Sequence, residues 1–307
     1  MGASPERVNA ALTGRMPDRV PVVEFVVDPK VAFALAPGAR DVAEACDRIG
    51  LDGVGCGAAF RRVREDNERF IDEWGVQYMS GPQVVAHPVR GPITSKDDLH
   101  RWTPPDPDAS FRLETLRANV ARFKGRRAIL FHHRAAFMWS AYLVGIDRLL
   151  ELFYDDPEFV QELFGKVYAV NERIVRNAVR AGAEVVVLGD DYASNHGTLF
   201  SPAMFREFVL PYLRRMVNAI HEEGALAIKH SDGNIRILLD DIVAAGADGL
   251  NPIEPVPGMD LAEIKAEYGR RICLVGNIDC GKLLSHGTPQ AVKAAAVSYT
   301  HLTLPTN

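Results

Sequence analysis

The sequence has few cysteines, no excess of basic residues and no long apolar run, and each absence excludes a class of protein. Its four cysteines (Cys46, Cys56, Cys273 and Cys280) form no CxxC pair, so they indicate reduced thiols rather than a disulfide framework. The net charge of −5 supplies no basic field for nucleic acid or anionic lipid. No apolar run approaches the roughly 20 residues that span a bilayer. We therefore expect a cytoplasmic protein that binds neither nucleic acid nor membrane.

The 307 residues, 47% of them hydrophobic and 24% charged, are typical of a soluble globular enzyme. Short apolar runs alternate with longer segments of helical period, which predicts a mainly parallel sheet with helical crossovers. The seven predicted strands are Val20–Val27, Leu51–Gly55, Ala128–Phe131, Glu184–Leu188, Leu226–Lys229, Gly249–Ile253 and Ile272–Gly276. The pattern predicts an α/β protein, a (β/α)8 barrel that is one strand short, with a polar and proline-rich insertion over Arg61–Pro107.

The end of the chain departs from this alternation. A helix that starts at Thr288–Pro289 should precede the eighth strand, but the chain continues as SYTHLTLPTN. We therefore expect a single barrel domain over residues 1–297, truncated before its eighth strand, and a non-native tail over 298–307. The alternative is a genuine disordered tail on a seven-stranded barrel.

Polar side chains cluster just after the predicted strands, where barrel enzymes place their active sites. The candidates are His132 and Arg134 after the third strand, Asp190 and Asp191 after the fourth, His230 and Asp232 after the fifth, Asn251 and Glu254 after the sixth, and Asn277 and Asp279 after the seventh. Each has a plainer interpretation, because an Asp after a strand is often a helix N-cap and an Asn often braces a loop. Their concentration at one pole nevertheless predicts the active site there.

The sharpest local pattern is His230-Ser-Asp232. Alternate residues of an extended segment point the same way, so imidazole and carboxylate face one cavity. The pair suits Zn²⁺, with Glu254 as a third ligand from the neighbouring strand. A metal-free site in which the carboxylate orients the ring is the alternative.

Several longer motifs carry a family resemblance. RMPDRVPV, FIDEWGVQY, LFSPAMFREFVLPYLRRMV, GADGLNPIEPVPGMDLAEIK and VGNIDCGKLLSHGTP resemble the uroporphyrinogen decarboxylase superfamily. The resemblance implies one (β/α)8 barrel domain. The superfamily includes haem-pathway decarboxylases and also zinc- and corrinoid-dependent methyltransferases, so two chemistries are implied.

The decarboxylase pattern is poorly kept. The paired arginines after the first strand of that branch are missing from VVEFVVDPK, which carries Glu24 and Asp28 instead. The family's aspartate after the second strand falls at Cys56 and its serine of the fourth strand end at Asp191, while its tyrosine is kept as Tyr142. Carboxylates beside an octa-anionic porphyrinogen would repel it, so this reaction is disfavoured.

The methyltransferase pattern fits better. That branch binds zinc through a His-x-Cys pair and a cysteine after the eighth strand; here His230 matches and Asp232 replaces the first cysteine. The resemblance implies transfer of a methyl group from a methoxylated or similar small molecule to a corrinoid supplied by a partner protein, with Zn²⁺ held by His230, Asp232 and Glu254 as Lewis acid.

Each remaining candidate has an expected part in this reaction. Asp191, Glu254 and Tyr142 are the predicted catalytic residues, and either of the two acids is expected to protonate the leaving oxygen. Substrate contacts are predicted for His132, Arg134, Asp190, Asn251, Asn277 and Asp279. A porphyrinogen decarboxylase and an inactive ligand-binding fragment remain the alternatives.

Overall fold

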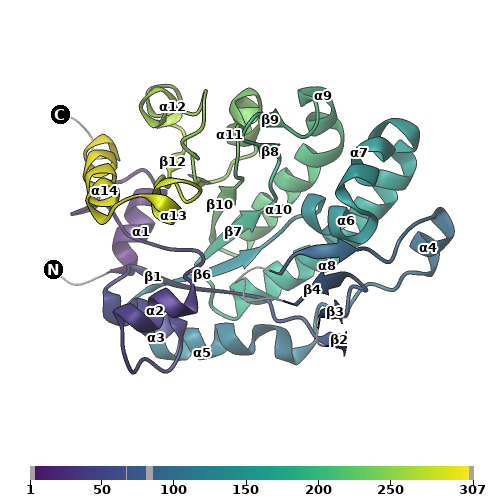
Figure 1. Ribbon diagram of the computed structural model, residues 1–307, viewed down its shortest axis with the longest axis horizontal. Helices are drawn as coiled ribbons and strands as arrows, with labels where there is room; N and C mark the ends of the chain where they lie inside the picture. The colour runs from purple at the N-terminus through teal and green to yellow at the C-terminus, as the bar shows by residue number, and fades with distance from the viewer. Residues whose placement is uncertain (1–3, 67, 81–85, 304–307) are drawn as a thin grey trace.

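The structure, a computed structural model, describes residues 4–66, 68–80 and 86–303. Its centre is a parallel sheet of six strands in the order β1-β6-β7-β10-β11-β12 (Figure 1). These strands are β1 (Gly53–Gly57), β6 (Ala128–His133), β7 (Val185–Gly189), β10 (Leu226–His230), β11 (Gly249–Asn251) and β12 (Cys273–Leu274). Six of the seven predicted strands are thus confirmed, in the order that βα repeats produce.

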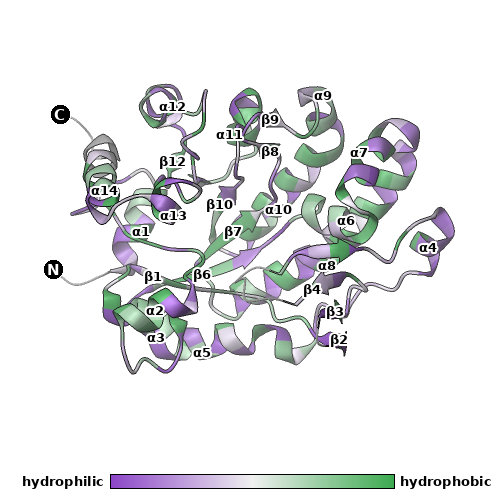
Figure 2. Ribbon diagram, viewed as in Figure 1, coloured by the Kyte–Doolittle hydropathy of each residue, from purple (hydrophilic) through white to green (hydrophobic). Residues whose placement is uncertain are grey.

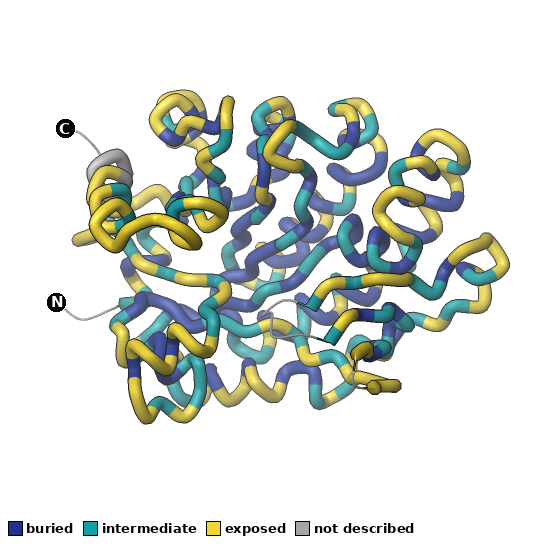
Figure 3. The backbone as a smooth tube through the Cα atoms, viewed as in Figure 1, coloured by how far each residue is buried: buried dark blue, intermediate teal, exposed yellow. Residues whose placement is uncertain are grey.

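Helices connect the strands and cover the outer side of the sheet. They are α1 (Pro5–Leu12), α2 (Pro29–Leu35), α3 (Val42–Ile49), α4 (Lys96–Arg101), α5 (Glu114–Phe123), α6 (Phe137–Val144), α7 (Ile146–Asp155), α8 (Pro157–Arg180), α9 (Pro202–Met204), α10 (Leu210–Glu222), α11 (Leu239–Ala244), α12 (Leu261–Tyr268), α13 (Leu283–His286) and α14 (Pro289–Thr303). A π-helical turn, Phe205–Val209, joins α9 to α10, and the Ser201 hydroxyl caps α9 by accepting from Met204 N–H. Figure 3 shows buried strands surrounded by helices with exposed outer turns.

Alternation along the strands separates two cores. Ala128, Leu130, Val185, Val187 and Ile228 form an inner cluster, which α1 closes with two further apolar side chains, Val8 and Leu12. The residues between them pack outward against the helices in the larger core. In Figure 2, β7 is accordingly hydrophobic along most of its length. Two-sided burial explains why these strands are nearly continuous apolar runs in the sequence.

The first predicted strand is the exception. Val20–Val27 forms no strand and does not join the sheet. Near its start, the backbone N–H of Asp52 donates to Val22 O. Within the described residues no strand follows β12, so the sheet has open edges at β1 and β12 and no closed barrel forms. A suitable residue pattern becomes a strand only where neighbouring strands can bond to it. Among the described residues, no strand of the sheet pairs with this segment.

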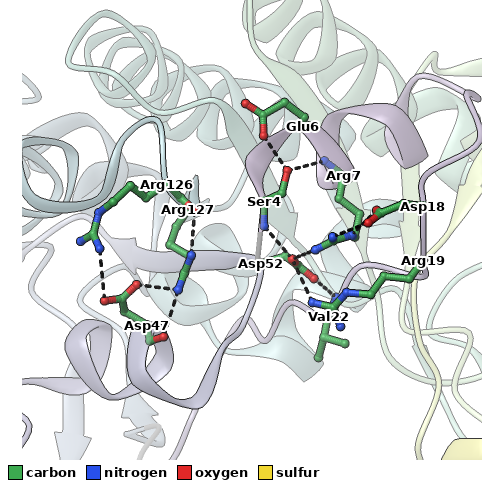
Figure 4. A network of polar contacts seen from close by, with 10 residues as sticks. All are labelled: Ser4, Glu6, Arg7, Asp18, Arg19, Val22, Asp47, Asp52, Arg126 and Arg127. Carbon is green, nitrogen blue, oxygen red and sulfur yellow. Dashed lines mark hydrogen bonds and ion pairs between the residues drawn. The ribbon is translucent and has the colours of Figure 1, made fainter. Parts of the chain in front are cut away.

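A buried ion-pair network holds the N-terminal segment at the amino end of β1 (Figure 4). Asp52, fully buried just before β1, accepts from the Arg7 guanidinium at 2.5 Å and from the backbone N–H groups of Ser4 and Val22. Arg7 also pairs with Asp18, at 2.6 Å. The network joins α1, the RMPDRVPV motif and β1, so this motif is used for folding.

The predicted insertion over Arg61–Pro107 is present and has a sheet of its own. Four antiparallel strands, β2 (Arg62–Glu65), β3 (Arg69–Asp72), β4 (Gln77–Met79) and β5 (Pro88–Arg90), follow one another in chain order. A two-stranded hairpin, β8 (Ala193–Ser194) and β9 (Gly197–Thr198), follows β7. Both insertions leave the sheet at the carboxyl ends of parallel strands, the pole at which the candidate site lies.

The predicted tail falls partly outside the described residues. Helix α14 begins at Pro289 as expected, with the Thr288 hydroxyl accepting from Ala291 N–H, and continues to Thr303. Residues 304–307 of the predicted tail lie outside the described part of the chain. Among the described residues, no helix has the length and apolar character required to span a bilayer.

Candidate metal and active site

The inner side of the sheet ends in histidines. His132 follows Leu130 on β6 and His230 follows Ile228 on β10, so each ring occupies the layer above the apolar inner cluster. The Phe25 ring, from the extended N-terminal segment, lies 5.7 Å from the His132 ring and 6.4 Å from the His230 ring, measured between centroids. The two imidazoles therefore share one apolar wall at the carboxyl end of the sheet.

Three side chains form a compact group of possible metal ligands. Asp191, His230 and Asp232 each offer one ligand atom, and these atoms all lie within 4.8 Å of one another. His230 Nε2 is 3.7 Å from one oxygen of Asp191 and 3.7 Å from one oxygen of Asp232. Asp191 also accepts from the Asp232 backbone N–H at 3.1 Å, which holds the loops after β7 and β10 together. One imidazole and two carboxylates are a ligand set that Zn²⁺ accepts.

Asn251 determines which nitrogen of His230 is available. Its Nδ2 donates to Val275 O at 3.0 Å, so its Oδ1 is the acceptor that faces His230 Nδ1 at 2.5 Å. Nδ1 of His230 therefore carries the proton in the neutral ring, and the lone pair is on Nε2, beside the two carboxylates. Asn251 was predicted to contact substrate; the structure instead places it behind the histidine.

The charges of the group favour a cation between them. Burial is the largest single influence on His230 and lowers its pKa. The contact with Asp232 and its negative charge, the hydrogen bond to Asn251 and the charge of Asp191 together outweigh burial, so the pKa of His230 rises above its ordinary value. The His230 contact and charge, opposed by burial, lower the pKa of Asp232. Asp191 and Asp232 thus form a negative site that a proton on His230 or a metal ion neutralises.

Glu254 lies beside this group and outside it. Its carboxylate accepts from Gly233 N–H at 2.7 Å, on the loop that carries Asp232. The carboxylate that completes the three-residue group is Asp191, which was predicted only as a catalytic residue, whereas Glu254 was predicted both as a catalytic residue and as the third ligand. Sequence spacing cannot make this distinction, because both acids follow strands that flank β10.

Asp190, predicted to contact substrate, is used within the fold. It is buried, and its two oxygens accept the backbone N–H groups of Ala135 and Met138 at 2.8 and 2.9 Å. These bonds tie the end of β7 to the first turn of α6. Both oxygens of Asp190 accept bonds within the fold, and the neighbouring Asp191 is the carboxylate of this pair that belongs to the group of possible metal ligands.

A buried lysine donates hydrogen bonds to the ends of β7 and β10 from the outer side of the sheet. Lys229, fully buried, donates to Asp190 O at 2.5 Å and also to the carbonyl of His230, and its ammonium lies 4.0 Å from the centre of the Tyr192 ring. Burial, partly offset by the charges of Asp190 and Asp191, lowers its pKa to about 8. Sequence reasoning missed this residue, although a lysine inside a buried apolar strand was a visible signal.

The third strand end supplies two groups with unused nitrogens. His132 Nε2 and Arg134 Nε are buried, and neither has a hydrogen-bond partner among the described residues. Burial, with the positive charge of His230, lowers the pKa of His132 to about 4, so its ring is neutral at pH 7. The Arg134 guanidinium lies 5.5 Å from the centre of the Tyr142 ring and 3.5 Å from its hydroxyl oxygen. His132 and Arg134 fit the predicted substrate contacts, and Tyr142 lies beside Arg134.

The two residues of the last strand end support loops. Asn277 is buried and its Nδ2 donates to Ile253 O at 2.8 Å, while its Oδ1 is buried without a partner among the described residues. Asp279 accepts from Lys282 N–H at 2.9 Å and so caps the turn before α13. Both side chains are engaged in holding the loop after β12.

The fold and this pole define a barrel-type α/β enzyme scaffold, and comparison with known proteins gives its family. A family model described as uroporphyrinogen decarboxylase (URO-D) matches residues 74–301, more than half of the chain. The chain belongs to the uroporphyrinogen decarboxylase family. This confirms the family resemblance of its motifs.

Known relatives leave the reaction open. A uroporphyrinogen decarboxylase of Chlorobium phaeovibrioides is 28% identical over 218 residues, which are 67% of this chain and 58% of the relative. One of Chlorobium limicola is 26% identical over 261 residues, 81% of this chain and 69% of the relative. The chain thus spans less than two thirds of the first relative's length.

A solved structure matches the whole fold. A methyltransferase from Methanosarcina mazei superposes with a TM-score of 0.74 at 20% sequence identity, covering 99% of this chain and 91% of that one. At this identity the likeness shows the fold alone. It confirms the predicted α/β class of TIM-barrel type, although the six-stranded sheet of this chain remains open in the described residues.

Proposed function

We propose that this protein is a methyltransferase or demethylase that transfers a methyl group from a methoxylated or similar small molecule to a corrinoid supplied by a partner protein. The observation that carries the proposal is the Asp191–His230–Asp232 group, in which Asn251 leaves Nε2 of His230 free for a metal. The donor set fits Zn²⁺, which when bound supplies a Lewis acid for the methyl-bearing oxygen.

The chain's own residues have defined parts in this reaction. In this reaction the C–O bond to the methyl group would break, the methyl group would pass to the corrinoid acceptor of the partner protein, and the oxygen would keep the bonding electron pair and take up a proton. Glu254 is the acid left for that proton, because Asp191 belongs to the ligand group. Arg134, beside Tyr142, offers a cation to an anionic group of the substrate. Neutral His132 offers a hydrogen-bonding nitrogen at the same pole.

Zinc analysis of purified variants tests the site directly. His230→Ala, Asp191→Asn and Asp232→Ala should each reduce bound zinc well below one equivalent, while Glu254→Gln retains it. Asp232→Cys should restore or strengthen binding, since a thiolate is a stronger zinc ligand than a carboxylate in such sites. Zinc content that is unchanged in His230→Ala would contradict the metal site.

Activity decides between the two chemistries of the family. Methylation of added cob(I)alamin, followed by its absorbance, should require both a methoxylated donor and the zinc-loaded protein. The second candidate, decarboxylation of a porphyrinogen, is favoured by the curated relatives. It predicts CO₂ release from a polycarboxylated porphyrinogen after zinc is removed by chelation, and that result would replace the methyltransferase proposal.

A further inference from the structure

The four-stranded antiparallel sheet of the insertion has one face toward the core and one toward solvent. Phe70, Asp72 and Tyr78 are buried, with the Phe70 and Tyr78 rings stacked 4.9 Å apart and the Tyr78 hydroxyl donating to Asp72. Residues between these on β3 and β4 must therefore point to the opposite face. The strand β2 at the sheet's edge is exposed along its length (Figure 3).

The outer face gathers arginines. Cross-strand pairing aligns Arg64 with Ile71, Ile71 with Gln77 and Gln77 with Arg90, so these four side chains form one row across the sheet. Arg69 lies two residues before Ile71 on the same face. The guanidinium groups of Arg64, Arg69 and Arg90 form no ion pair with a carboxylate of the described chain, in contrast to Arg62, which pairs with Glu65.

Two of these arginines line a pocket of about 140 Å³ that opens to the surface, where Arg64, Asp66 and Arg69 are exposed. Its lining residues are Arg64, Asp66, Arg69, Phe70, Ile71 and Gln77. Asp66 is the only acidic residue among these lining residues. Its Oδ1 accepts from the backbone N–H groups of Glu68 and Arg69 at 2.9 and 2.8 Å, and its Oδ2 has no hydrogen-bond partner among the described residues. These backbone bonds, and then the charges of Arg69 and Arg64, lower the pKa of Asp66, so the carboxylate is ionised at neutral pH.

We propose that this pocket binds a phosphate group that carries a proton. Guanidinium groups bind phosphate oxygens through paired N–H donors, and Arg64 and Arg69 supply two of them, with the Gln77 amide as a neutral donor. A carboxylate beside them would repel a fully deprotonated anion. It can instead accept the O–H of hydrogen phosphate at Oδ2 of Asp66, the oxygen that bonds to none of the described residues. Sulfate has the same size and charge but no such proton, so the pocket distinguishes the two.

Binding measurements with inorganic phosphate test the proposal. Isothermal titration calorimetry at pH 7 and constant ionic strength should show phosphate binding at least tenfold more tightly than sulfate. Arg64→Gln and Arg69→Gln should each weaken phosphate binding at least tenfold. Arg148→Gln is the matched control: it removes the same charge from an exposed arginine of α7 that pairs with Glu151, and should leave phosphate binding unchanged.

Asp66→Asn separates the carboxylate's role from the arginines'. The amide oxygen can still accept the two backbone bonds, so the loop should fold, and circular dichroism with thermal melting checks this for every variant. Losing the proton acceptor should bring the affinities for phosphate and sulfate within threefold of each other.

A titration with glycerol phosphate identifies the source of the phosphate group. Tighter binding than inorganic phosphate indicates a phosphorylated small molecule, and weaker binding indicates free phosphate. Absence of binding by both, or equal binding in wild type and the two arginine variants, overturns the proposal.

Discussion

The side-chain oxygen of Asn251 lies 2.5 Å from Nδ1 of His230, on the far side of the ring from Asp191 and Asp232. This contact joins β11 to β10, where the two residues are directly paired in the sheet. It orients the imidazole so that Nε2, rather than Nδ1, faces the carboxylates. In the proposed zinc site the amide would therefore orient the ligand histidine without touching the metal.

Asn251→Ala should weaken zinc binding about 10- to 100-fold, the usual effect of losing a group that orients a ligand histidine. The ring would be free to rotate and to change its protonated nitrogen. Zinc affinity, measured by competition with a chromophoric chelator, checks this. Asn218→Ala, at an exposed position of α10, is the control and should retain wild-type affinity. Equal affinities in both variants would contradict the role of Asn251.

Loss of the Asp190 carboxylate tests whether that residue serves the fold or the substrate. Asp190→Ala leaves two backbone N–H groups at the start of α6 without acceptors, so it should lower the free energy of unfolding by about 2–4 kcal/mol. Chemical denaturation measures this. Asp279→Ala, which removes one exposed turn contact, should cost about 1 kcal/mol or less. A variant of Asp190 with full stability and a raised KM would restore the substrate role.

These residues show how far sequence reasoning reaches. The alternation in His230-Ser-Asp232 predicted that these two side chains face the same way, and they lie close together in the structure, because alternation is a local property of an extended chain. The third member, Asp191, and the orienting Asn251 depend on how β7, β10 and β11 align, which no local pattern records. The same limit explains Val20–Val27, whose residues suit a strand although the described sheet does not pair with them.

The buried His133 predicts a dependence of stability on pH. Its ring is packed against Phe60, and Nε2 lies 3.1 Å from Asn171 Oδ1. Burial first, and then the charge of Arg134, lowers its pKa to about 3. The unfolded chain binds a proton near pH 6.5 while the folded one does not, so stability is present above that pH and falls as the pH drops toward 3.

The slope from this one group should reach about 1.4 kcal/mol per pH unit between pH 6 and 4. His133→Gln keeps an amide donor for Asn171 but cannot take up a proton, so its stability should fall less steeply over the same range. Urea denaturation at half-unit pH intervals gives both curves. Parallel curves would mean that His133 does not contribute to the acid sensitivity.

Asp52 provides the largest predicted effect on stability. It is fully buried and accepts from Arg7, Ser4 and Val22, so Asp52→Ala leaves a buried guanidinium and two backbone N–H groups without that acceptor. Removing one partner of a buried ion pair typically costs about 3–5 kcal/mol.

Asp18 is the matched control, since it also pairs with Arg7 but its side chain is 42% exposed. Asp18→Ala should therefore cost clearly less than Asp52→Ala, because water replaces part of the lost contact. Urea denaturation of both variants gives the comparison. The network lies at the amino end of β1, opposite the pole that carries the candidate site, so zinc content should stay at the wild-type level wherever the protein remains folded. Similar losses from the two substitutions would show that burial of Asp52 does not determine the strength of the network.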